Sequence, residues 1–233
     1  MIIILLALVL MSSAHSATIV TQGRAFEKGS NHTKLLFTFK RTQTGAEPNV
    51  HVDTQFVAPD GTLLVTEEVT FAGGKVKSYL VHHKQTKQEG ALEVGERLNF
   101  RYTQDGETRE DSEGLPKDLV IGPTIIANIQ SRWDVLMKGG TESFRFAVLD
   151  RKETVGFKFF KDDEEVREGR SVIHFIMKPS SFIIAAVVDP IHFYFWKDTK
   201  DIAEIRGRTL PKQQVDGKFK DLDPEILYTV QRT

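Results

Sequence analysis

The most regular hydrophobic pattern in the chain lies between residues 115 and 160. Apolar residues there recur at three- and four-residue steps, the spacing of one face of an amphipathic helix. They are Ile125, Ile126, Ile129, Trp133, Leu136 and Met137. Pro123 suits a first helical turn, and Gly139-Gly140 suits a helix end. The pattern predicts one helix over residues 123–138.

The period changes to two residues directly after this helix. Apolar side chains then alternate with polar or small ones, and they are Phe144, Phe146, Val148, Val155, Phe157 and Phe159. A period of two is typical of a half-buried strand. The two segments therefore predict a β-hairpin whose aromatic face packs against the helix.

Short alternating segments separated by turn residues fill most of the remaining chain. Strands are expected at 19–26, 35–41, 49–58, 63–71, 76–83, 92–102, 171–177, 191–196, 202–209 and 226–230. About a dozen antiparallel strands predict a mainly β fold, a half-open barrel that wraps the amphipathic helix. A second, short helix is predicted over Phe182–Val188, and its uniformly apolar composition indicates burial. A charged loop is expected at 107–113 and a loose polar segment at 211–223.

The N-terminal residues have a targeting pattern. Residues 2–11 are apolar without interruption, and small residues follow as far as Ala17. This arrangement is typical of a secretory signal peptide, here cleaved after Ser16, and the run is shorter than the ~20 residues of a membrane span. We expect a signal peptide at 1–16, a single β-barrel-like domain at 17–233, and a secreted or periplasmic protein.

Composition narrows the range of functions. The formal net charge is −1 and the pI is near 6.7, whereas nucleic-acid binding requires a clustered basic surface. The absence of cysteine excludes disulfides, thiol catalysis and cysteine-based zinc sites. No phosphate loop, nucleophile elbow or zinc-binding helix motif occurs. The sequence therefore predicts no nucleic-acid partner, cofactor or metal.

The phenylalanine content indicates a large aromatic interior in the second half of the chain. Ten of the 16 phenylalanines lie beyond Gly140, and they can form either a filled core or the lining of an apolar cavity. The candidate cavity residues are Trp133, Met137, Phe144, Phe146, Phe157, Phe159, His174, Phe193 and Phe195. Arg151 belongs either to a solvated turn or to the cavity mouth, where a guanidinium can pair with a carboxylate or phosphate headgroup.

Several segments resemble exported bacterial proteins of unknown function. The resemblance rests on Gly122-Pro123, Trp133-Asp134, residues 144–151, residues 153–157 and Arg206-Gly207-Arg208. Those families are similar in outline to the lipoprotein-carrier (Lol-type) half-barrels, in which a curved sheet and helices enclose an apolar cavity for acyl chains. The resemblance implies such a fold and cavity, and it supplies no catalytic residue.

Three functional hypotheses follow from these patterns. The first is a non-catalytic binding or carrier protein for an apolar, acyl-chain or lipid-like ligand. The second is a cell-envelope structural or assembly protein that holds a partner through an exposed sheet edge or through the charged loops. The third, and the least supported, is a hydrolase in which Asp150 and Glu153 serve as acid and base. The oligomeric state is left open.

Overall fold

The computed structural model describes residues 19–186 and 188–232. The predicted signal peptide at 1–16, with its cleavage after Ser16, lies outside the described residues. Within the described part of the chain, no helix has the length and hydropathy needed to cross a bilayer.

The first half of the chain is an antiparallel meander in which each strand pairs with the next. Its strands are β1 (Ile19–Phe26), β2 (Leu35–Ala46), β3 (Asn49–Val57), β4 (Leu63–Ala72), β5 (Lys75–His83), β6 (Gln88–Val94), β7 (Arg97–Gln104) and β8 (Glu107–Gly114). Gly73 and Gly74 both have positive φ, which explains why glycine occupies the tight turn between β4 and β5.

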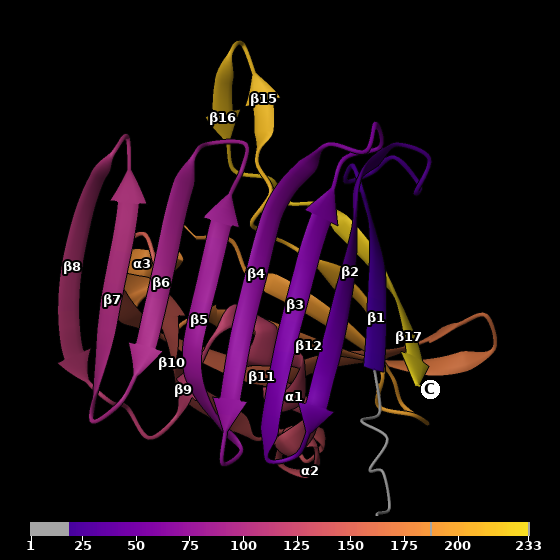
Figure 1. Cartoon of the computed structure of the whole chain (residues 1–233). Coiled ribbons are helices and arrows are strands. Elements are labelled where there is room, and N and C mark those ends of the chain that lie inside the picture. The colour runs from indigo at the N-terminus through magenta and orange to yellow at the C-terminus, as the bar shows by residue number, and fades with distance from the viewer. Residues whose placement is uncertain (1–18, 187, 233) are drawn as a thin grey trace, which may run out of the picture.

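The second half continues the same sheet from the other side. Its strands are β9 (Leu119–Val120), β10 (Thr141–Val148), β11 (Glu153–Arg167), β12 (Arg170–Pro179), β13 (Ile191–Trp196), β14 (Ile202–Arg206) and β17 (Glu225–Arg232). β17 pairs with both β1 and β14, which joins the halves into a 15-stranded sheet whose edge strands are β8 and β9 (Figure 1). β15 (Gln213–Val215) and β16 (Lys218–Lys220) form a separate hairpin.

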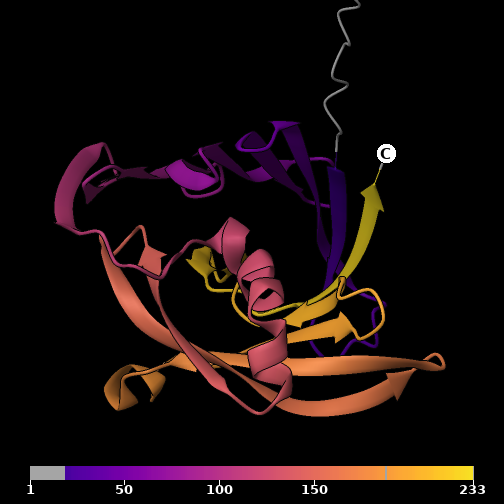
Figure 2. The same cartoon turned by 90° about the horizontal axis from the view of Figure 1, so that it is seen from below.

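The sheet bends around a short helical segment that lies on its concave side (Figure 2). This segment contains η1 (Gly122–Thr124), α1 (Ile125–Ser131) and α2 (Trp133–Met137). The prediction of one continuous helix is corrected at Arg132, which separates α1 from α2. Its φ is −103° and its ψ is 10°, and its N–H donates to the carbonyl of Ile129, three residues earlier, at 3.1 Å. Ile129, Trp133 and Leu136 are nevertheless all buried, so α1 and α2 present one continuous apolar face to the sheet.

Two hydrophobic clusters lie on the concave side of the sheet. The first is built mainly from the meander and includes Phe37, Val65 and Phe100. The second joins Trp133 and Leu136 to the aromatic strands of the second half. The helix therefore packs on the aromatic strand faces, as the sequence pattern predicts.

The mainly β, antiparallel fold is confirmed, but three local predictions are wrong. The charged segment 107–113 is the edge strand β8, and segment 211–223 contains the hairpin β15–β16. The second helix is the single turn α3 (Phe182–Ala185), and it is not buried because Phe182 and Ile183 project into solvent. One turn at the end of β12 can present only one side to the fold, and here that side carries Ile184.

Candidate functional site

A cavity of about 1110 Å³ lies between the meander, α1 and the strands of the second half. Its lining runs from buried aromatic residues to exposed ones such as Asp150 and Arg151, so the cavity reaches the surface. An apolar wall comes from the second half of the sheet and a polar wall from the meander. The second half also contributes Lys212 and Asp221 to the lining, and the meander also contributes Phe39 and Phe56.

The second half of the chain supplies the apolar wall. Phe146 on β10, Phe157 on β11 and Phe193 on β13 all line the cavity. The Phe146 and Phe157 rings meet edge to face, with centroids 5.8 Å apart and an interplanar angle of 72°. Met177 on β12 and Ile126 on α1 complete this wall.

The meander supplies a polar wall centred on Glu67. Glu67 follows the inward alternation of Val65 and Val69 on β4 and is only 4% exposed. The Tyr79 hydroxyl donates to Glu67 Oε1 (2.7 Å), and Arg41 Nη2 donates to Glu67 Oε2 (3.3 Å). These charge-assisted bonds satisfy a carboxylate that would otherwise be costly to bury. Burial, reinforced by the charge of Glu67, raises the pKa of Tyr79 well above its ordinary value.

The start of the helical segment rests on this polar wall. A Cβ at Gly122 would lie 3.4 Å from the Tyr79 hydroxyl oxygen and 3.6 Å from Glu67 Oε1. Arg41 Nη1 also donates to Pro123 O (3.5 Å). The chain therefore approaches the Glu67 cluster closely at a position where the residue has no side chain.

His83, at the end of β5, is a strongly perturbed titratable group in the cavity lining. Its Nδ1 atom is buried and has no hydrogen-bond partner among the described residues. Burial, together with the positive charge of Lys212, lowers the pKa of His83 to about 4, and the opposing effect of Asp150 is smaller. His83 is therefore a neutral polar group at physiological pH.

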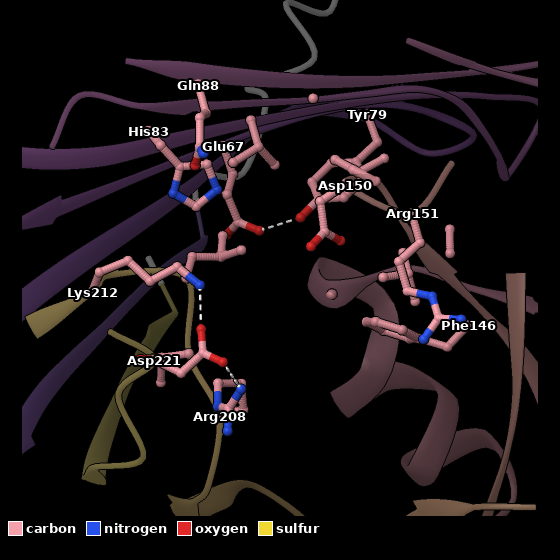
Figure 3. A pocket seen from close by; sticks show the side chains of 18 of the residues that line it. Glu67, Tyr79, His83, Gln88, Phe146, Asp150, Arg151, Arg208, Lys212 and Asp221 are labelled. Atoms are coloured by element: carbon pink, nitrogen blue, oxygen red, sulfur yellow. Dashed lines mark hydrogen bonds and ion pairs between the residues drawn. The ribbon is translucent and has the colours of Figure 1, made fainter. Parts of the chain in front are cut away.

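An ion-paired group faces His83 at the side of the cavity (Figure 3). Lys212 Nζ lies 2.5 Å from Asp221 Oδ1, and Asp221 also pairs with Arg208. The side-chain amide of Gln85 binds both the N–H and the carbonyl of Lys212, each at 2.9 Å. These contacts fix the base of the β15–β16 hairpin beside the cavity.

Arg151 lies among the exposed residues of the cavity rim. Asp150 and Lys152 line the cavity beside it. Arg151 Nε is 2.7 Å from Glu153 Oε1, an exposed ion pair of the kind that contributes little to stability. The guanidinium is thus near the mouth and already has a carboxylate partner.

Of the nine proposed cavity residues, Phe146, Phe157 and Phe193 are in the lining and six are not. Phe144 and Phe159 are buried behind it, with ring centroids 4.3 Å apart. Trp133 packs edge-on against Phe195 at 5.8 Å, and Met137 lies at the margin of the same cluster. These five residues pack in the second hydrophobic cluster, outside the lining, and a role for them in ligand binding stays a prediction.

His174 is also outside the lining, and its side chain lies on the outer face of the sheet. Its ring stacks on Tyr194 with centroids 4.4 Å apart, and its Nε2 is 2.9 Å from Nδ1 of His192. Asp162 Oδ2 is 3.1 Å from the other ring nitrogen. Burial and the neighbouring His192 lower the pKa of His174. The alternation with Val172 and Ile176 is real, but Phe175 marks the inward face.

The sequence analysis missed the polar wall entirely. The sequence does contain a pattern that indicates it. Glu67 lies between Val65 and Val69 in the period-two alternation of its strand, and Arg41 follows Phe37 and Phe39 in the same way. A charged residue at an inward-facing position of a strand indicates a buried ion pair or a site. His83 carried no comparable signal, because its neighbour His82 is equally polar and pairs with Glu89 on the other face.

Two groups outside the cavity have the donor atoms of a metal site. They are His32, Glu204 and Glu225, and His51, Asp53 and Glu68. In the first group, burial opposes ionisation of Glu204, but hydrogen bonds from Arg206 and Arg167 prevail and lower its pKa. Those guanidinium groups occupy the carboxylate oxygens that a cation would need. None of these six residues lines the cavity.

No family model, curated protein or solved structure matches this chain. The resemblance to exported bacterial proteins and to Lol-type half-barrels therefore stays a prediction. The cavity and its two walls are the observations on which a functional assignment rests.

Proposed function

We propose that this protein binds an apolar or amphiphilic ligand, such as an acyl chain or lipid, in the cavity and does so without catalysis. The single observation that carries the proposal is the cavity of about 1110 Å³ with its wall of Phe146, Phe157 and Phe193. Ligand pockets in proteins commonly have volumes of roughly 300–1,000 Å³ and mostly apolar linings. Each CH₂ group of a ligand buried here would gain ~0.8 kcal/mol.

The polar wall supports an amphiphile over a plain hydrocarbon. Tyr79, Glu67 and Arg41 already satisfy one another, but His83 Nδ1 has no partner among the described residues. That nitrogen is out of a ligand's reach because it has almost no exposed surface, so the polar end of a ligand would instead meet the charged side chains of Lys212 and Arg208 in the lining. In this proposal the curved sheet acts as the half-open barrel expected from the sequence, with the ligand between its two halves.

The assembly hypothesis lacks a comparable observation. It requires an edge strand suited to pairing, and β8 carries five charged residues within Glu107–Gly114. Charged side chains on an edge strand are a common protection against pairing with another chain. The hydrolase hypothesis is also weak, because Asp150 is exposed and Glu153 is paired with Arg151. An acid–base pair needs two carboxyl groups in contrasting environments.

The decisive experiment is mass spectrometry of an organic extract from protein purified without detergent. We expect a stoichiometric lipid or other apolar compound, or else saturable binding of a fluorescent fatty acid by the extracted protein. Phe146→Trp, which adds bulk inside the cavity, should weaken binding about tenfold. Phe160→Trp, on the opposite face of the sheet from Phe159, is the matched control and should bind as the wild type does. An empty extract together with no saturable binding would overturn the proposal.

A further inference from the structure

The α3 turn carries the most exposed large apolar side chains in the described residues. Phe182 is 89% exposed and Ile183 is 80% exposed. The base of the turn is fixed, because Ser180 N–H donates to Gly156 O at 2.9 Å. Two adjacent, fully projecting apolar side chains on a fixed turn are typical of a surface that contacts another apolar phase. Figure 2 shows this turn, in orange, at one corner of the fold.

Three cations lie on the outer face of the sheet next to this turn. Lys158 and Lys178 are directly opposite each other on β11 and β12, and like charges in that arrangement repel. Arg145 pairs in register with Gly156 and lies diagonally from Lys158. Its guanidinium bonds to the hydroxyl and carbonyl oxygens of Thr154. None of the three forms an ion pair with a carboxylate in the described part of the chain, so this basic group lacks a counter-charge.

The same corner adjoins the cavity. Ile184, the third residue of α3, points inward and lines the cavity, as does Val188 just after the turn. The exposed and the inward-facing residues thus belong to one segment of a few residues. Any surface that covers Phe182 and Ile183 would lie beside this part of the cavity wall.

We propose that α3 and the basic group of Arg145, Lys158 and Lys178 dock this protein on a lipid surface with anionic headgroups. Apolar side chains of a surface element enter the boundary between headgroups and acyl chains, while adjacent lysines and arginines attract the anionic lipids. The three cations favour an anionic lipid surface over a purely apolar partner, such as the same turn of a second copy, because only the lipid surface would supply opposite charges. The docking is independent of the proposed ligand binding, although it would bring the cavity wall close to the source of a lipid.

The cysteine-free chain allows a direct test of insertion. Phe182→Cys, labelled with an environment-sensitive fluorophore, is mixed with vesicles of equal parts phosphatidylglycerol and phosphatidylcholine. We expect the emission to shift to the blue and to be quenched by spin-labelled lipid. Val166→Cys is the matched control, since Val166 is a 72% exposed apolar residue at the far end of the β11–β12 hairpin. Both variants share the same N-terminus, so any vesicle binding by residues 2–11 affects them equally.

The outcomes of this test separate the alternatives. A response at position 182 and none at position 166 supports docking through α3. No response at position 182, or equal responses at both positions, would overturn it. A monomer–dimer equilibrium in the absence of lipid that disappears in Phe182→Ser would also overturn it, because the occupant would then be a second copy.

A second set of variants tests the charge. Lys158→Gln/Lys178→Gln should weaken binding to the phosphatidylglycerol vesicles about tenfold or more, since each lysine near an anionic surface contributes roughly a fivefold factor. Lys75→Gln/Lys77→Gln, on exposed positions of β5, removes the same charge elsewhere and should change the affinity little. Equal weakening by both pairs, or equally tight binding of pure phosphatidylcholine vesicles, would contradict a specific basic docking surface.

Discussion

The two halves of the sheet line the same cavity, but each places a different buried cluster in its wall. The second half presents Phe146, Phe157 and Phe193, whereas the meander presents Glu67 and Tyr79. The apolar wall makes no directional hydrogen bonds, so its side chains are held by packing alone. The polar wall is held by directional hydrogen bonds and by a charge pair, so it fixes side chains in one arrangement. Under the proposed function, the wall of Phe146, Phe157 and Phe193 would supply contact area for a ligand, and the Glu67 cluster would supply a fixed polar surface.

A second contrast lies within the aromatic half itself. Phe144, Phe159, Phe175 and Phe195 are fully buried, while Phe146 borders open space in the same cluster. Rings of one residue type thus have two roles, filling and lining. Substitution of a ring that fills the core is expected to have the largest effect on stability.

Phe159→Ala should destabilise the protein by about 3–5 kcal/mol. Phe159 has no exposed surface and stacks on Phe144, so truncation removes buried area and leaves a void. Chemical denaturation of the variant provides the measurement. Phe159→Leu keeps most of the volume and should cost less than about 1.5 kcal/mol. A cost for the alanine variant that is no larger than this would show that the ring does not fill the core.

Glu67→Gln should destabilise the protein by about 2–3 kcal/mol at neutral pH. It leaves the half-buried guanidinium of Arg41 without its carboxylate and replaces a charge-assisted acceptor of Tyr79. The neighbouring Glu68→Gln, exposed on the other face, should change stability by less than about 0.5 kcal/mol. Equal stability of the two variants would mean that the polar wall is not held by its ion pair.

His83 should make stability depend on pH in a defined window. Its pKa is about 4 in the folded protein and 6.5 for a fully solvated histidine, so the unfolded chain binds the proton more readily. This contribution to stability is fully present above pH 7 and is lost progressively as pH falls from about 6.5 to about 4, by about 3 kcal/mol in total. Denaturation of wild type and His83→Gln at pH 7.5 and 4.5 measures it. The variant should lose less stability over this interval, and His82→Gln should behave as the wild type.

These residues also show how far the sequence predicts the molecule. Alternation and turn residues predicted the antiparallel strands, because strand period and turn chemistry are local properties. The inward face of the central hairpin was predicted by the same means. Side-chain periodicity cannot tell a filling ring from a lining one, so Phe144 and Phe146 were assigned the same role. That distinction depends on how the two halves curve toward each other.

Other errors arose where local pattern and tertiary position disagree. Glu107–Gly114 has no apolar alternation, yet it pairs as β8 because an edge strand needs only backbone partners on one side. Segment Phe182–Val188 is apolar enough to be buried, but its position at the end of β12 leaves Phe182 in solvent. His174 alternates correctly, but sequence does not state which face of a strand is concave.

Phe146→Ala, set beside Phe159→Ala, compares a ring that lines the cavity with a ring that fills the core. Apart from the controls, it has the smallest expected effect on stability of the substitutions considered. Phe146 is half-buried and already borders the cavity, so its truncation enlarges existing space without creating an isolated void. We expect a loss of about 1 kcal/mol in the free energy of unfolding, well below that of Phe159→Ala, since the cost depends on the cavity that remains. Affinity for a fluorescent fatty acid should fall in Phe146→Ala while stability changes little. If instead the two alanine variants lose equal stability, the space beside Phe146 is closed in solution, and the apolar wall belongs to the core.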